Sequence, residues 1–282
     1  MSVVHLGGRL VDEAQARISP FDRGFLLGDA VFETMRAYDG APFALDAHLA
    51  RLRAGCDAAR LAFPEGLPRA IDDVLRANGL RDASVRVTVS RGPGGRGASP
   101  QGAGPQTVLV TAGPVPERPE AWTRGLHLVT AARRRVGAES LETGVKTTNY
   151  LVHVLARAEA EDAGADDALF VDAEDLVVEA TQANVFAVFR DRLVTPPLES
   201  GCLPGVTRAT LLRLAPDAGL QPVERAVPRD ALHEADEVFL SASVLEVAPV
   251  TRLDGVVVGG GRPGPRARAL HALYRKHATQ AA

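Results

Sequence analysis

Cysteine, lysine and long apolar runs are all scarce in this sequence of 282 residues. Its two cysteines, Cys56 and Cys202, stand alone without CxxC spacing, which argues against a disulfide framework or a zinc site. The longest charge-free stretch, residues 97–116, is interrupted by glycines and prolines, so we expect no transmembrane helix. Only two of the 32 basic residues are lysines, Lys146 and Lys276. A GC-rich genome would account for much of that bias, because arginine codons are GC-rich and lysine codons are not. Whatever its cause, the bias makes each lysine worth examining.

Charge and composition exclude further classes. A formal net charge of −3 argues against a protein that binds a nucleic-acid backbone, because such domains are usually strongly basic. With 46% hydrophobic and 24% charged residues, the chain has the composition of an ordinary globular protein. The first residues show neither the cationic start nor the apolar core of a signal peptide, so we expect a cytoplasmic protein that binds no membrane.

The pattern of elements predicts an α/β (α+β) protein of two domains. The chain mixes strands and helices without a regular βαβ alternation, which disfavours a parallel barrel. The segment Gly113–Pro119 is rich in glycine and proline and is the best candidate linker. We therefore predict an N-terminal α/β domain over residues 1–113, a linker over 114–122 and a C-terminal domain over 123–282. Helices are expected over residues 46–61, 68–78, 148–162, 207–214 and 265–280.

Several familiar chemical motifs fail on inspection. Residues 92–97 match GxGxxG after a predicted strand, but a dinucleotide fold needs a helix next, and here a second strand follows. The simplest interpretation of these residues is a long hairpin loop. A more specific interpretation is a loop in which Arg91 or Arg96 binds a substrate carboxylate. The histidines show no metal-ligand spacing, and no GxSxG motif supports a serine hydrolase.

The first lysine carries the strongest chemical signal. Lys146 lies between an irregular stretch and a helix whose apolar face (Leu151, Val154, Leu155, Ala158) is expected to pack against the protein. Desolvation there would favour the neutral amine, which can add to a carbonyl. Lys276, on a charged terminal helix, is best interpreted as a surface residue.

A lysine that carries pyridoxal phosphate as a Schiff base needs two more parts, an acid for the ring nitrogen and a phosphate cradle. Glu179 follows an apolar strand and is a candidate buried acid. Gly205-Val206-Thr207 opens a predicted helix, whose free N–H groups would bind an anion, with the Thr207 hydroxyl as a further donor. A structural glutamate or a capping threonine would look similar, so the order of the three signals along one chain matters most.

These residues resemble the class IV (fold type IV) aminotransferases over nearly the whole chain. The resemblance is carried by the following segments: Asp22-Arg23-Gly24-Phe25, Gly28-Asp29, Phe32-Glu33, Ala47–Leu52, Val145–Tyr150, Glu179-Ala180-Thr181, Asn184-Val185-Phe186, Leu203–Arg208, and Ser241-Ala242-Ser243 followed by Glu246 and Pro249-Val250.

The resemblance implies a fold, a cofactor and residue roles. It implies two α/β domains with pyridoxal 5'-phosphate between them, in homodimers whose sites share a loop of the partner. Lys146 would be the catalytic Schiff-base lysine, moving a proton at the substrate carbon, and Glu179 would meet the pyridine nitrogen. Arg51, Val206, Thr207 and Ser243 would hold the phosphate. The expected substrate-binding residues are Phe32, Arg36, Arg96 and Thr181, and the expected substrates are an amino acid and a 2-oxo acid.

Substrate choice stays open at this point. The family includes branched-chain L-aminotransferases, D-amino-acid transaminases, (R)-amine transaminases and aminodeoxychorismate lyases. Residues 90–97 are similar to the loop of the lyases, whereas residues 146–151 and 203–208 look at least as much like D-amino-acid transaminases. The Arg-x-His element of many D-amino-acid enzymes is missing, since Gly97 and Ala98 follow Arg96. Arg36 and Arg96 could form a different carboxylate clamp.

We therefore predict a transaminase that favours D-amino acids slightly over branched-chain L-amino acids, with the lyase as runner-up. A non-catalytic metabolite-binding protein of this fold is the alternative from another class. Retention of both Lys146 and Glu179 speaks against that alternative, and nothing repeats in the chain as a scaffold protein would require.

Overall fold

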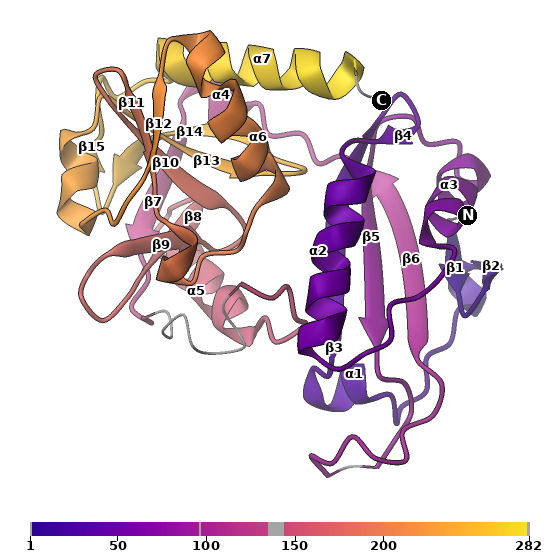
Figure 1. Cartoon of the computed structure of the whole chain (residues 1–282). Coiled ribbons are helices and arrows are strands. Elements are labelled where there is room, and N and C mark those ends of the chain that lie inside the picture. The colour runs from indigo at the N-terminus through magenta and orange to yellow at the C-terminus, as the bar shows by residue number, and fades with distance from the viewer. Residues whose placement is uncertain (1, 96, 135–143, 281–282) are drawn as a thin grey trace. The chain divides into compact units, whose positions relative to one another are not determined.

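The computed structural model describes residues 2–95, 97–134 and 144–280, which divide into two compact units (Figure 1). Unit 1 takes in the described residues within 1–116, 145–149 and 278–282, and unit 2 those within 117–144 and 150–277. Each unit mixes helices and strands around its own apolar core, so the α/β fold class is confirmed.

Unit 1 is built on short and long strands in one antiparallel sheet. Its described strands run in the order β2-β1-β6-β5-β3-β4. The strands are β1 (Val3–Leu6), β2 (Arg9–Asp12), β3 (Ala30–Tyr38), β4 (Ala41–Pro42), β5 (Ala83–Ser90) and β6 (Thr107–Pro114). The helices are α1 (Arg23–Leu27), α2 (Leu45–Ala58) and α3 (Leu67–Ala77), with a short 3-10 turn at Glu13–Gln15.

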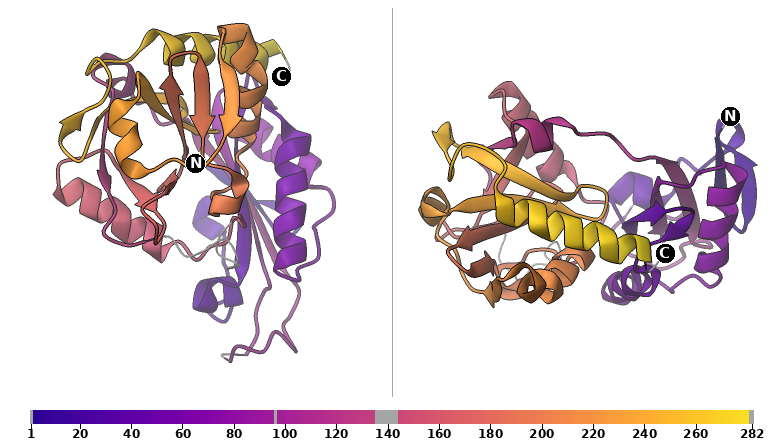
Figure 2. Two further views of the ribbon diagram at one scale, coloured as in Figure 1. Left: turned by 60° about the vertical axis from the view of Figure 1, so that its left-hand side comes forward. Right: turned by 90° about the horizontal axis from the view of Figure 1, so that it is seen from above.

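The sheet of unit 1 has one apolar face and one polar face. In β5 the side chains of Val85, Val87 and Val89 are fully buried, whereas Arg86 between them is exposed, because side chains alternate across a strand. Helices α2 and α3 cover the apolar face (Figure 2). Helix α3 packs there through residues at helical spacing: Leu67, Ala70, Ile71, Val74 and Leu75.

The glycine-rich stretch after β5 is a hairpin loop, as the sequence predicted. Strands β5 and β6 pair antiparallel from Ala83↔Pro114 to Ser90↔Thr107, so residues 91–106 connect two neighbouring strands. The following element is a strand, which excludes a dinucleotide-binding turn at this position.

Unit 2 holds a larger mixed sheet. Its described strands run in the order β12-β11-β10-β13-β14-β7-β8-β9, with β15 beside β14. They are β7 (Leu126–Thr130), β8 (Asp167–Val171), β9 (Val177–Ala180), β10 (Asn184–Phe189), β11 (Arg192–Thr195), β12 (Gln221–Glu224), β13 (Glu237–Ala242), β14 (Glu246–Leu253) and β15 (Val256–Val257). The helices are α4 (Glu120–Thr123), α5 (Leu151–Asp162), α6 (Val206–Leu214) and α7 (Pro265–Gln280), with 3-10 turns at Leu198–Ser200, Ala215–Ala218 and Arg229–Glu234.

The core of unit 2 lies inside this sheet, which curls. Strand β9 ends the pairing order yet also lies beside β10, near the opposite end. Apolar side chains from most of the strands meet in the space enclosed, among them Leu128, Val185 and Leu240. A second cluster packs α5 against β8 through Ala156, Ala160 and Phe170.

Two predicted helix starts need correction. Helix α2 begins at Leu45, one residue before the predicted start, with Ala44 as its N-cap residue and Asp46 in its first turn. An acid there still interacts favourably with the helix dipole. Helix α5 begins at Leu151, not at residue 148, because the residues before it pair with β3 of unit 1.

The apolar face of α5, which was expected to be buried, is exposed in this chain. Leu151, Val154 and Leu155 are 70%, 58% and 38% exposed. Helix α5 instead buries His153 and two alanines, whose small side chains let it lie close to β8. The expectation that this face packs against the rest of the chain is therefore wrong.

The division of the chain differs from a simple cut at the linker. The chain passes from unit 1 to unit 2 after Pro116, and the predicted boundaries at 113 and 123 stay a prediction. Val145–Asn149, which a linear cut assigns to the C-terminal domain, belongs to unit 1. The Phe32 N–H donates to the Lys146 carbonyl and the Thr148 N–H to the Ala30 carbonyl. No helix among the described residues is long and apolar enough to cross a membrane.

Candidate active site

Lys146 lies in unit 1, on a short segment added to the edge of β3. Its backbone carbonyl accepts from Phe32, and Thr147 forms a bridge with Val31. Its amine Nζ lies 4.4 Å from the centroid of the Phe32 ring. The residue is half-buried, and the face of an aromatic ring at that distance attracts a lysine ammonium group. Phe32, predicted as a substrate-binding residue, is thus brought together with the predicted catalytic lysine.

Arg51 is held by a buried carboxylate that sequence reasoning did not single out. Its Nε donates to Glu33 Oε2 at 2.8 Å and its Nη2 to Glu33 Oε1 at 2.6 Å, a two-point pairing. His48 Nδ1 lies 3.2 Å from the same Oε1. Burial alone would raise the pKa of Glu33, but hydrogen bonds from His48 and Arg51, with their charges, outweigh it and hold the pKa at about 2. Arg51 is therefore fixed in place as a cation.

A second cation lies beside Phe32. The Arg86 guanidinium carbon is 3.7 Å from the ring centroid, and Arg86 Nε donates to the Thr88 hydroxyl at 3.3 Å. Arg86 comes from the polar face of β5, where Phe32 pairs with Thr88. Sequence reasoning missed Arg86, although the alternation of β5 places it opposite the buried valines.

Of the two arginines in the predicted carboxylate clamp, the structure describes only Arg36. Arg36 pairs with Asp82 through Nε at 2.9 Å and Nη2 at 2.8 Å, so a substrate carboxylate would have to share it. Arg96 lies outside the described residues. The clamp stays a prediction.

Glu179 is a buried acid in unit 2, as the sequence suggested. It lies within β9, not at its end, and is 5% exposed. Its Oε2 accepts from the Leu203 N–H at 3.0 Å. That contact ties the carboxylate to the segment that leads into α6.

The start of α6 is suited to an anion. Gly205 precedes the helix and supplies no side-chain cap to the first N–H groups, and Val206 and Thr207 form its first turn. A Cβ on Gly205 would lie 2.0 Å from Asn184 Oδ1, so only glycine lets the chain approach β10 here. Thr207 Oγ1 is 3.5 Å from the Tyr274 hydroxyl.

Serines on and after β13 add hydroxyl groups to unit 2. Ser243 follows β13 in the turn toward β14, and its expected role in binding the phosphate stays a prediction. The Ser241 hydroxyl is buried and finds no hydrogen-bond partner among the described residues. Buried polar groups are normally hydrogen-bonded, so this hydroxyl is available to a group that binds there.

Thr181 has a structural partner. Its hydroxyl donates to Asp167, and its carbonyl lies 2.7 Å from His153 Nδ1. Burial raises the pKa of Asp167, while hydrogen bonds from Thr181 and Ala168 only partly oppose that effect. The predicted contact between Thr181 and substrate stays a prediction.

Comparison with known proteins shows which family this chain belongs to. A model of the family described as Amino-transferase class IV matches residues 30–253, which includes the lysine, the acid and the start of α6. The chain belongs to the class IV aminotransferases. It is a pyridoxal phosphate-dependent enzyme, as the resemblance implied.

Relatives of this aminotransferase match it over nearly their full length. A protein of Methanocaldococcus jannaschii, provisionally named a branched-chain-amino-acid aminotransferase, is 37% identical over 96% of this chain and 95% of its own. The D-alanine aminotransferase of Bacillus licheniformis is 34% identical over 93% of this chain and 92% of its own. Among solved structures, the fold matches the branched-chain amino acid aminotransferase from Thermobaculum terrenum, crystallised in its PLP-form. The TM-score is 0.88 at 28% identity, and the match covers 100% of this chain and 95% of the other. The fold type IV expectation is confirmed.

Each unit of this aminotransferase, taken by itself, contains groups that suit a part of the cofactor. Unit 1 supplies an amine beside an aromatic ring and a fixed cation. Unit 2 supplies a buried acid, an uncapped helix start and a buried hydroxyl that has no described partner. An aldehyde, a phosphate and a basic ring nitrogen are the groups that such side chains bind.

Proposed function

We propose that this enzyme transfers the amino group of a branched-chain L-amino acid to a 2-oxo acid. The observation that carries the proposal is the full-length similarity at 37% identity to a relative with that provisional name. Solved branched-chain enzymes at 28–31% identity support it. The D-amino-acid preference is the second candidate, favoured by the D-alanine aminotransferase at 34% identity.

Pyridoxal phosphate supplies an aldehyde and a ring that draws electrons from the substrate's α-carbon. We infer that Arg51, Val206, Thr207 and Ser243 bind its phosphate and that Glu179 accepts a hydrogen bond from its protonated ring nitrogen. Within unit 1, the role proposed for Arg51 is supported by the contacts with Glu33 and His48, which hold its guanidinium. Within unit 2, the role proposed for Glu179 is supported by the hydrogen bond from Leu203, which orients its carboxylate.

Lys146 would bind the cofactor through Nζ and then move a proton between the substrate's α-carbon and the adjoining carbon of the cofactor. Both tasks need the neutral amine at some stage, since an ammonium has no lone pair. The Phe32 ring, 4.4 Å away, limits the water around Nζ and the directions the amine can take. Arg86 lies beside the same ring, with its guanidinium carbon 3.7 Å from the ring centroid.

Two exposed apolar surfaces support a homodimer. In unit 1 Phe21, Phe25 and Leu27 are 50%, 78% and 42% exposed, and a pocket of about 480 Å³ lined by Ile18, Phe25 and Leu109 lies beside them. In unit 2 the exposed face of α5 adds Leu151 and Val154. Monomeric proteins rarely expose apolar patches of this kind, and a second copy of the chain would cover them.

Phe25→Asp is expected to weaken this dimer at least roughly 30-fold, because a charge would enter its apolar contact. Light scattering across a concentration series measures the change. Val256→Asp is the matched control, since Val256 is 51% exposed in β15, outside both apolar surfaces. A wild-type protein that is monomeric and fully active would refute the dimer.

A panel of amino donors separates the candidate activities. With 2-oxoglutarate as acceptor, we expect L-leucine to react at least about tenfold faster than D-alanine, D-glutamate or (R)-1-phenylethylamine. Chiral chromatography of the amino acid formed reports the stereochemistry. Faster reaction with D-alanine would favour the second candidate, and pyruvate release from an aminodeoxychorismate without nitrogen transfer would favour the lyase. A protein that binds the cofactor but turns over none of these donors would instead be a metabolite-binding protein.

The location of the protein is a further part of the proposal. Both cysteines are free and buried, which suits a reducing compartment, and we infer that the enzyme acts in the cytoplasm.

A further inference from the structure

Glu246 is a buried acid in a backbone conformation that usually belongs to glycine. It is the first residue of β14, it is 4% exposed, and its φ of 61° lies in the left-handed region. It pairs with Ala242, the last residue of β13, so residues 243–245 form the hairpin turn between the two strands. Hairpin turns of this length usually take glycine at their left-handed position, because a Cβ is strained there. Such a conformation persists in another residue only where surrounding contacts hold it.

Two basic side chains of α7 hold the Glu246 carboxylate. Its Oε2 accepts from His271 Nε2 at 2.6 Å, and its Oε1 lies 3.8 Å from Arg275 Nε. The two basic residues are four positions apart, so they lie on one face of the helix. The His271 ring also stacks on Trp122 of α4, with the ring centroids 4.6 Å apart and the planes at 18°. The stacking sets the plane of the ring, and the hydrogen bond sets its direction within that plane.

The same face of α7 reaches the start of α6. Tyr274, three residues after His271, is 1% exposed, and its hydroxyl lies 3.5 Å from Thr207 Oγ1. Thr207 belongs to the first turn of α6, and α6 packs against β13. Helix α7 therefore contacts two segments that are far apart in sequence, the start of α6 and the hairpin of β13 and β14. All of these residues lie in unit 2.

A buried hydroxyl in the same hairpin indicates a ligand beside it. Ser241 is 1% exposed, and its Oγ finds no hydrogen-bond partner among the described residues. Ser241 pairs with Val247 of β14, the residue that follows Glu246. Buried polar groups are normally hydrogen-bonded, so this hydroxyl is available to a ligand at the end of the hairpin that Glu246 closes.

We propose that Glu246 is a positioning residue through which α7 holds the turn at residues 243–245 in the conformation that binds the cofactor phosphate. Glu246 can act as this link because its backbone ends the turn while its side chain is bound by His271. The inference rests on the proposed phosphate-binding roles of Thr207 and Ser243. It extends them to a carboxylate that acts through the turn.

Glu246→Gly in the full chain is expected to weaken the binding of pyridoxal phosphate roughly 10- to 100-fold, because residues that orient the ligands of metal sites have effects of that size. Glycine suits the left-handed backbone, which keeps the variant folded. Pyridoxal, the same aldehyde without a phosphate, should bind within about threefold of its wild-type affinity, since a ratio of two affinities isolates the group that differs. Absorbance titration of enzyme freed of cofactor measures both. An equal loss for the two compounds would overturn the proposal.

Asp175→Gly is the matched control for the backbone. Asp175 also has a left-handed φ, of 64°, and it lies between β8 and β9 of the same unit. Its carboxylate pairs with Arg134 and Arg229. The variant exchanges a paired acid for glycine as Glu246→Gly does, but in a different turn, so the ratio of the two affinities should match wild type. A shift as large as that of Glu246→Gly would contradict a role specific to Glu246.

His271→Leu and His271→Gln separate positioning from packing. Leucine removes the donor to Glu246, whereas the glutamine amide can still donate. We expect His271→Leu to bind pyridoxal phosphate at least about tenfold more weakly than His271→Gln, the range of one hydrogen bond to a charged group. Equal affinities in the two variants would show that the hydrogen bond does not position the turn.

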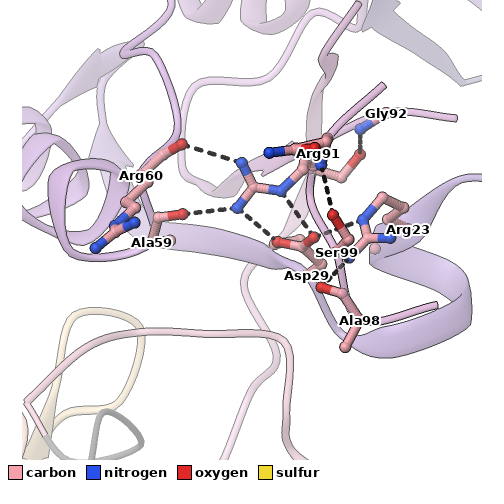
Figure 3. Close-up of polar contacts among 12 residues, drawn as sticks. Arg23, Asp29, Ala59, Arg60, Arg91, Gly92, Ala98 and Ser99 are labelled. Atoms are coloured by element: carbon pink, nitrogen blue, oxygen red, sulfur yellow. Dashed lines mark hydrogen bonds and ion pairs between the residues drawn. The ribbon is translucent and has the colours of Figure 1, made fainter. Parts of the chain in front are cut away.

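Asp29 in unit 1 controls for a general loss of stability. Its carboxylate accepts from Arg23 Nε and Arg91 Nε, each at 2.8 Å (Figure 3), and its side chain is 17% exposed. Asp29→Asn removes the charge of a carboxylate that, like Glu246, is held by two basic side chains. It should lower the melting temperature and leave the ratio of the two affinities unchanged. A ratio that simply follows the melting temperature across all variants would make Glu246 a structural residue only.

The affinities can be measured whether or not the enzyme transfers amino groups. If the ratio shifts in Glu246→Gly but the wild-type enzyme transfers no amino group, the positioning role holds and the proposed function fails. If the enzyme is an active transaminase and Glu246→Gly binds pyridoxal phosphate as wild type does, the positioning role alone fails.

Discussion

Lys146→Ala is expected to lose the visible absorbance of the lysine-bound cofactor and to reduce turnover by a factor on the order of 10⁴, the upper range for removal of an acid–base group. The chain has one other lysine, Lys276, so its sequence offers a single alternative lysine amine. Lys146→Arg should be as inactive, because a guanidinium stays protonated near neutral pH and cannot add to the aldehyde. Absorbance spectra and steady-state rates measure both effects.

Lys276→Ala is the matched control for this prediction. It removes the other lysine, from the exposed side of α7, and should leave absorbance and turnover within about twofold of wild type. Turnover that survives in Lys146→Ala, or that is lost in Lys276→Ala, would contradict the assignment.

Glu33→Gln is expected to have the largest effect on stability. Glu33 is fully buried, and removing its charge breaks its ion pair with Arg51, whose side chain is 12% exposed. Breaking a buried ion pair on one side typically costs about 3–5 kcal/mol. Denaturant unfolding at pH 7 measures the change. Cofactor affinity should also fall, because Arg51 is then no longer held for the phosphate.

The pH dependence of this loss has a definite sign. The pKa of Glu33 is lowered from 4.5 to about 2, so its charge stabilises the fold above pH 4.5 and that contribution is lost as the pH falls toward 2. A shift of that size corresponds to roughly 3 kcal/mol. The difference in unfolding free energy between wild type and Glu33→Gln should therefore shrink between pH 4.5 and pH 2.

Asp72→Asn serves as the control for Glu33→Gln. It breaks an exposed pair with Arg76 and should cost no more than about 1 kcal/mol. A Glu33→Gln protein as stable as wild type at pH 7 would show that the buried pair contributes little.

The positions proposed for the chemistry could be selected from the sequence because each is marked by its local sequence. Lys146 stands out in a chain that uses arginine elsewhere, and Gly205-Val206-Thr207 shows the pattern of a helix start. Glu179 was expected to be buried from its apolar neighbours, and it is. Family resemblance then supplied the roles that spacing alone left open.

Pairings between distant residues were not predictable in the same way. Glu33 was visible as an acid inside an apolar strand, but its pairing with Arg51 depends on how α2 lies against β3. Arg36 and Thr181 were expected at the substrate, and their bonds to Asp82 and Asp167 also depend on tertiary packing. Arg86 could have been found, since strand alternation places it opposite buried valines.

For some elements, the amino-acid composition did not indicate where they lie in the fold. Strand β14 lies in the middle of the sheet of unit 2, yet it contains Pro249, which cannot donate to a neighbouring strand and usually marks an edge. The α5 surface was misjudged for another reason. An apolar helix face predicts burial but does not say against what, and within this chain Leu151 and Val154 stay exposed.

Reductive trapping tests the central claim most directly. Borohydride treatment of the holoenzyme fixes the bond between a lysine and the cofactor, and peptide mass spectrometry then locates the modified residue. We predict a phosphopyridoxyl group on the peptide that contains Lys146 and none on the peptide that contains Lys276. A group on Lys276, or no modified peptide in a preparation that transfers amino groups, would contradict the account.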